Sequence, residues 1–184
     1  DVLESKIETE DVKRIKINPP LAFPEKVKEV SNLLLNAKRP VLVVGGQVHI
    51  STRSRKLVEK VAKVHNLPVL CTYEHQDIIS NDNLHYAGEL GLRPPEPIRK
   101  NALEADLVLV VGHRFNGVPN MAYKFPSSKQ MFIHVIPDPN TIGKIFRTDM
   151  GIVADSENFL EQLSNFANDN INNERNEWVK LCHY

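Results

Sequence analysis

This sequence of 184 residues has no long hydrophobic run, no excess of charge of one sign and only two cysteines. The longest apolar runs have the length of a strand, far below the roughly 20 residues that a membrane-spanning helix needs. Lysine and arginine number 23, as do aspartate and glutamate, so no overall field attracts nucleic acid or an anionic membrane. We therefore expect neither of these partners.

The two cysteines, Cys71 and Cys182, cannot form a zinc site by themselves. Cys71 falls inside an apolar run, so we interpret it as a small core residue. So few cysteines are typical of a reducing compartment, and residues 1–6 are too charged for the apolar core of a signal peptide. The sequence thus predicts a cytoplasmic location.

Several nucleotide and nucleophile motifs are also missing. No glycine is followed by Lys-Ser or Lys-Thr at the spacing of a Walker A loop, and no Gly-x-Ser-x-Gly elbow occurs. Gly45 and Gly46 follow an apolar run, but Gln47, Val48 and His49 stand where a dinucleotide fingerprint needs further glycines. A double glycine after a strand is more often a tight turn than a phosphate cradle, by about two to one in our judgement.

Two continuous apolar runs dominate what is present. Residues 107–111 read Leu-Val-Leu-Val-Val before Gly112, and residues 41–44 read Val-Leu-Val-Val before Gly45. Unbroken runs of this kind indicate strands that helices cover on both faces, as in a parallel sheet. Such folds bind ligands at the carboxyl ends of their strands.

Strand and helix patterns alternate along the rest of the chain. Strands are expected at residues 67–72, 131–136 and 150–155, and helices at 24–37, 52–66, around 98–103 and from Ser156 to 167. Most of residues 73–92 is interpreted as loop. The pattern predicts a doubly wound α/β domain with a mainly parallel sheet of about five or six strands. We place a linker arm at 1–23, this central domain at 24–167 and a C-terminal linker segment at 168–184, whose Trp178 lies in a small apolar cluster that is expected to dock.

Polar side chains give no convincing catalytic group. His75, His85 and His113 fall in predicted loops, whereas His134 reads as a core imidazole within a strand. Beside His113, Arg114 suits recognition of phosphate or carboxylate, although an exposed basic loop is an equally good interpretation. Asp138 and Asp155 precede helical segments, where aspartate commonly caps, and Ser156 is a further expected cap. We expect no catalytic residue and no metal ligand set.

Several segments together resemble one family, the central domain of thiamine diphosphate-dependent enzymes such as acetolactate synthase. The resemblance covers roughly residues 25–165 and rests on residues 39–46, 67–72, 81–88, 105–115, 134–139 and 152–155, in the family's order. It implies a Rossmann-like domain that serves as scaffold and subunit contact. In the family, the ligands of thiamine diphosphate and Mg²⁺ lie in two other domains, which bind the pyrimidine and the pyrophosphate.

The resemblance also implies a nucleotide site in some members, for FAD in acetolactate synthases or ADP in oxalyl-CoA decarboxylases. The cofactor-binding candidates in this sequence are Gly45, Gly46, Gly91, Leu92, Arg93, Gly112, His113, Arg114, Asn116 and Asp155. Three departures weaken the flavin assignment. Ile136 stands in place of an acidic residue, Asn116 in place of an aspartate, and Arg93-Pro94 in place of His-Gly.

We therefore expect the central, non-catalytic domain of a thiamine diphosphate-dependent 2-oxo acid enzyme, which decarboxylates its substrate and joins the fragment to an acceptor. Its expected partners are the two neighbouring domains of the same parent chain within a homo-oligomer. The alternatives are a nucleotide-binding regulatory module and the central domain of a flavin-free member, such as a benzoylformate or oxalyl-CoA decarboxylase. A sirtuin-like or deoxyhypusine synthase-like NAD enzyme is a further alternative, but paired zinc cysteines and a catalytic histidine loop are missing.

Overall fold

The computed structural model describes residues 4, 13, 15, 17–49, 51–166 and 173–184. Its centre is a six-stranded parallel sheet with strand order β3-β2-β1-β4-β5-β6. The strands are β1 (Pro40–Val44), β2 (Val69–Thr72), β3 (Tyr86–Leu90), β4 (Leu107–Val111), β5 (Met131–Ile136) and β6 (Met150–Val153). This order is that of a classical doubly wound fold, so the predicted fold class is confirmed.

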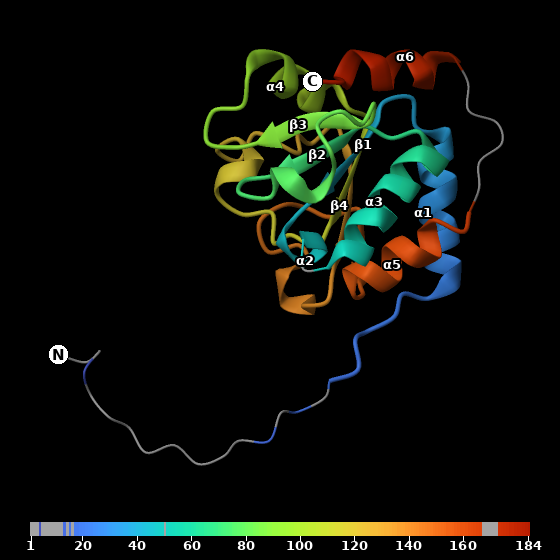
Figure 1. Ribbon diagram of the computed structural model, residues 1–184, viewed down its shortest axis with the longest axis vertical. Coiled ribbons are helices and arrows are strands. Elements are labelled where there is room, and N and C mark those ends of the chain that lie inside the picture. The colour runs from blue at the N-terminus through green and yellow to red at the C-terminus, as the bar shows by residue number, and fades with distance from the viewer. Residues whose placement is uncertain (1–3, 5–12, 14, 16, 50, 167–172) are drawn as a thin grey trace.

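Helices cover both faces of the sheet, as Figure 1 shows. They are α1 (Pro24–Asn36), α2 (Gly46–His49), α3 (Thr52–His65), α4 (Glu96–Glu104), α5 (Ser156–Leu163) and α6 (Asn173–Cys182). Helices α1, α3 and α5 pack together over one face, around a core that includes Val30, Val58 and Phe159. The other face is covered by α4, α6 and the segment that carries Phe115 and Phe125. Both faces of β1 and β4 are thus buried, which explains their unbroken apolar sequences.

Local signals place the helix ends as predicted. Pro24 opens α1, where its missing N–H is harmless. The hydroxyl of Ser51 accepts the N–H of Ser54 at 3.0 Å and caps α3. Asn66 ends α3 in the left-handed conformation, with φ of 49°.

The prediction that residues 73–92 are mostly loop is partly wrong, because this segment contains β3 and the 3₁₀ turn η2 (Gln76–Ile78). Gly88 interrupts the apolar pattern of β3 and has a φ of +99°. A Cβ at that position would lie 2.2 Å from Cδ1 of Ile98, so close packing of α4 requires the glycine. The register of β3 also shifts between Val69 and Cys71 of β2. An edge strand with these irregularities has no continuous hydrophobic signature.

Both aspartates that were predicted to cap helical segments do so. The Asp155 carboxylate accepts the N–H of Asn158 at 3.0 Å and caps α5. The further cap expected at Ser156 is wrong, because Ser156 is the first residue of α5. Asp138 caps the short turn η4 (Pro139–Thr141), because its carboxylate accepts the N–H of Asn140. Residues 168–172, the first part of the predicted C-terminal linker, lie outside the described residues.

Helix α6 docks the predicted apolar tail on this same domain. Nε1 of Trp178 donates to the carbonyl of Pro40 at 2.9 Å. Near the C-terminal end of α1, the buried guanidinium of Arg175 donates to the carbonyl of Leu34 at 2.8 Å and to that of Ala37. It also donates to the carbonyl of His65, the last residue of α3, at 3.1 Å. Whether the segment also acts as a linker stays a prediction. None of the described helices has the length and hydrophobicity that crossing a bilayer requires.

Candidate functional site

Three of the four glycines predicted to bind a cofactor, Gly45, Gly46 and Gly112, lie where the strand order reverses, at the carboxyl ends of β1 and β4. The N–H of Gly45 donates to the carbonyl of Val111 at 3.2 Å, and the N–H of Gln47 donates to that of Gly112 at 3.0 Å. In open α/β sheets the ligand crevice lies at this reversal. Gly45, Gly46, Gly112 and the following His113 are therefore brought together as the sequence predicts.

Imidazole rings occupy the space above the double glycine. A Cβ built on Gly45 would lie 2.5 Å from Cβ of His113, and one built on Gly46 would lie 2.8 Å from Nε2 of His75. Gly112 has a φ of +72°, and a Cβ built on it would lie 2.8 Å from the hydroxyl oxygen of Ser156. The close approach that these glycines permit is thus used by side chains of the protein itself.

Burial lowers the pKa of both His113 and His134 at this edge and so favours their neutral forms. Nδ1 of His113 accepts the N–H of Phe115 at 2.8 Å, which assigns the ring proton to Nε2. Nε2 of His134 donates to the His113 carbonyl at 2.8 Å. Burial lowers the pKa of His113 to about 4, and the charges of His75, His134 and Arg114 act in the same direction. His134 is a buried, hydrogen-bonded core residue, as predicted.

Arg114 and Asn116 line a second site, a cavity of about 310 Å³ beyond the ends of β4 and β5. It is lined by Arg114, Asn116, Asp138, Asn140, Thr141, Lys144 and Ile145. The Asp138 carboxylate accepts the N–H of Asn140 and the hydroxyl of Thr141, each at 3.0 Å, and these bonds lower its pKa. Neither Arg114 nor Lys144 forms a salt bridge with a described residue. The cavity therefore presents two cations, and the charge of Arg114 also acts on the Asp138 carboxylate in the same lining.

Leu92 and Arg93 line a third place, a cavity of about 600 Å³ between the segment after β3 and the segment after β4. Gly91 immediately precedes them, and its only neighbour near a built Cβ is the Glu89 carboxylate, at 3.7 Å. Asp155 belongs to none of these cavities, and its carboxylate caps α5. The ten cofactor-binding candidates are thus divided among separate places instead of forming one site.

Sequence reasoning missed two residues that the structure places at these sites. His75 had been interpreted only as a loop histidine, yet it covers Gly46. Lys144 had no role, yet it lines the cavity with Arg114. A basic residue shortly after a Pro-Asp-Pro turn is the signal that could have identified Lys144. Within the described ranges, no three His, Cys, Asp or Glu side chains are arranged to hold a metal ion.

Cysteine chemistry is also absent from this edge. Burial raises the pKa of the Cys71 thiol to about 12, with a smaller contribution from Glu89, so the thiolate that a nucleophile needs is disfavoured. Cys71 is a core residue, as predicted.

Comparisons with known proteins identify relatives over most of the chain. The family model described as "Thiamine pyrophosphate enzyme, central domain" matches residues 27–163. A probable acetolactate synthase large subunit of Methanococcus aeolicus is 29% identical over 153 residues, which are 83% of this chain and 25% of the relative. A glyoxylate carboligase of Escherichia coli O157:H7 is 27% identical over 187 residues, 98% of this chain and 31% of the relative.

A solved structure shares the fold. The benzoylformate decarboxylase of Polynucleobacter necessarius superposes with a TM-score of 0.65 at 22% identity, over 91% of this chain and 32% of that one. The chain thus spans between a quarter and a third of the length of these relatives.

Proposed function

Since the chain belongs to the family of thiamine pyrophosphate enzyme central domains, we propose that it is the central, non-catalytic domain of a 2-oxo acid enzyme similar to acetolactate synthase. The match over residues 27–163 carries this proposal. The parent enzyme would decarboxylate a 2-oxo acid and transfer the remaining fragment to an acceptor. Its other partners would be the pyrimidine- and pyrophosphate-binding domains of the same chain, in a homo-oligomer.

The side chains of this domain support a scaffold role. The cofactor of the parent, thiamine diphosphate, would supply the carbanion chemistry. Among the described residues, no three His, Cys, Asp or Glu side chains are arranged to hold a metal ion. The family resemblance assigns the ligands of Mg²⁺ to the neighbouring domains. The aligned glyoxylate carboligase and acetolactate synthase share this segment but differ in the reaction that their names state. A segment common to different reactions is better suited to support than to catalysis.

The nucleotide role that the resemblance implies is supported at one cavity only. FAD does not fit the double-glycine crevice, because His113 and His75 occupy the space above Gly45 and Gly46. Ile136, which is 2% exposed, has no acceptor for a ribose hydroxyl. The cavity of Arg114, Asn116 and Lys144 instead suits the phosphates of ADP, since two cations line it and neither forms a salt bridge with a described residue.

The enzymatic proposal is tested on the natural gene product that carries this segment. Release of CO₂ from pyruvate, and from other 2-oxo acids, is measured with and without thiamine diphosphate and Mg²⁺. Release that requires both additions is expected. A product that binds neither thiamine diphosphate nor 2-oxo acid would contradict the proposal.

The nucleotide proposal is tested separately by calorimetric titration of the 184-residue chain with ADP and FAD. Saturable binding of ADP is expected, and the double variant Arg114→Gln, Lys144→Gln should weaken it about tenfold or more, because two charge-assisted contacts are lost. Lys129→Gln, on the loop before β5, removes one charge outside this cavity and serves as the control. Binding of FAD with equal affinity, or ADP binding that survives the double variant, would contradict the assignment.

A further inference from the structure

The cavity of about 600 Å³ between α4 and the segment after β4 has the size and lining of a small-molecule site. Its apolar wall includes Leu92, Leu103, Met121 and Ala122, and Arg93 and Lys124 stand at its border. Leu92 is 72% exposed and Leu103 is 41% exposed, so two aliphatic side chains of this wall are open to a ligand. The cavity shares no lining residue with the Arg114 cavity to which we assign ADP.

One wall of this cavity is built rigidly in an unusual conformation. Met121, Ala122 and Tyr123 have φ values of 51°, 55° and 65°, a left-handed run that side chains other than glycine rarely adopt. Asn120, fully buried, holds the run in place: its Oδ1 accepts the N–H of Tyr123 at 2.9 Å, and its carbonyl accepts the N–H of Lys124 at 3.1 Å. Backbone in sparsely populated regions is concentrated at functional sites. Here it directs Met121 and Ala122 to the cavity.

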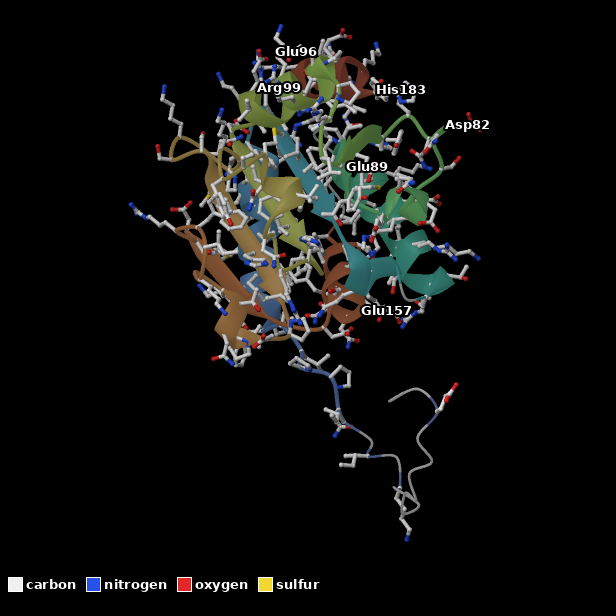
Figure 2. The ribbon with its side chains drawn as sticks, turned by 90° about the vertical axis from the view of Figure 1, so that its left-hand side faces the viewer. Asp82, Glu89, Glu96, Arg99, Glu157 and His183 are labelled. Carbon is white, nitrogen blue, oxygen red and sulfur yellow. The ribbon has the colours of Figure 1, made fainter. Side chains whose placement is uncertain are left out.

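The charges around the cavity are unequal. Glu96 and Arg99, both on α4, pair with each other and lie side by side at one end of the molecule in Figure 2. Arg93 and Lys124 form no salt bridge with a described residue. Once the pair on α4 is discounted, the lining carries two uncommitted positive charges beside an apolar wall. This combination is complementary to a molecule with an apolar body and an anionic end.

We propose that this cavity binds an apolar carboxylate, an aryl or branched alkyl group that carries one carboxylate. The apolar group contacts Leu92, Leu103 and Met121, and the carboxylate accepts hydrogen bonds from Arg93 and Lys124. Arginine is suited to this role because its planar guanidinium matches a carboxylate. The proposal depends neither on the ADP site nor on the reaction of the parent enzyme.

The test is a titration of the 184-residue chain with phenylacetate, followed by amide chemical shifts and calorimetry. Phenylacetamide lacks the charge and acetate lacks the apolar group, so both should bind about tenfold or more weakly than phenylacetate. The double variant Arg93→Gln, Lys124→Gln should reduce phenylacetate binding to the level of phenylacetamide. Leu103→Trp, which fills the cavity from α4, should weaken the binding of both phenylacetate and phenylacetamide.

The control variant is Lys100→Gln, which removes a charge from the same helix at a residue outside the cavity lining. It should bind phenylacetate as the unmodified chain does. Three results would overturn the proposal: no saturable binding of phenylacetate, equal binding by the Arg93→Gln, Lys124→Gln variant, or shift changes confined to the Arg114 cavity. Because Arg93, Lys100, Leu103 and Lys124 are all exposed, we expect each variant to fold, and circular dichroism checks this.

Discussion

The imidazole of His113 should make the stability of this domain depend on pH in a range where carboxylates contribute little. Its pKa is about 4 in the folded chain, against 6.5 for the unperturbed group, mainly because of burial. The folded state therefore binds fewer protons than the unfolded state between these values, and stability is lost as the pH falls from 6.5 toward 4. At about 1.36 kcal/mol for each pKa unit, the full loss is about 3 kcal/mol, of which about 2 kcal/mol appears by pH 5.

The assay is urea unfolding at pH 7.5 and at pH 5, followed by tryptophan fluorescence of the single residue Trp178. The variant His113→Asn removes the titrating group while an amide oxygen remains to accept the Phe115 N–H. The decrease in free energy of unfolding between the two pH values should be about 2 kcal/mol smaller in the variant. Burial also lowers the pKa values of His65, His85 and His134, so part of the pH dependence should remain.

A destabilised control separates titration from packing. Val43→Ala removes buried methyl groups from β1 and should lower stability by about 1 to 3 kcal/mol at both pH values, with an unchanged difference between them. If His113→Asn and Val43→Ala show the same pH difference, the reasoning about the buried imidazole is refuted.

Three other substitutions test contacts in the structure. Gly45→Ala should cost about 1 to 3 kcal/mol by overpacking against His113, and adding His113→Gly, which removes the clashing Cβ together with the ring, should recover part of this loss in urea unfolding; additive losses would contradict the contact. Trp178→Phe should cost about 1 to 2 kcal/mol in thermal unfolding, since the Pro40 carbonyl loses its donor, and an unchanged melting temperature would argue against the docking of α6. Asp155→Ala should cost about 1 kcal/mol through loss of the α5 cap, whereas Asp155→Asn should retain most of the stability; equal losses by chemical denaturation would exclude capping.

The parts of the fold that the sequence predicts are those whose cause is local. The unbroken apolar sequences of β1 and β4 follow from burial on both faces, so each run is enough to identify its strand. The ends of α1 and α3 are set by Pro24, Ser51 and Asn66, each acting within a few residues. Strand β3 was missed because its register shifts along β2 and because its Gly88 is required by the packing of Ile98 of α4, so the cause lies outside the residues of the strand.

The division of the candidate site could not be predicted for the same reason. His113 and Gly45 are 68 positions apart, and nothing in either neighbourhood indicates that the imidazole covers the glycine. Arg93 and Arg114 line different cavities although both follow strands at the same edge, and the segment after β4 contributes to both cavities. A shared edge limits where ligand contacts lie, but loop packing decides which residues meet.

The double glycine shows how one sequence signal can have two physical causes. A glycine after a strand indicates that some group approaches the backbone closely, and in dinucleotide-binding folds that group is a pyrophosphate. Here the groups are the rings of His113 and His75, and the helical turn α2, which begins at Gly46, closes the same edge. Because burial lowers the pKa of His113 to about 4, this imidazole offers an anion no positive charge at neutral pH. The uncommitted positive charges lie instead on Arg114 and Lys144 and on Arg93 and Lys124, so anion binding should follow those side chains and leave the glycines as packing residues.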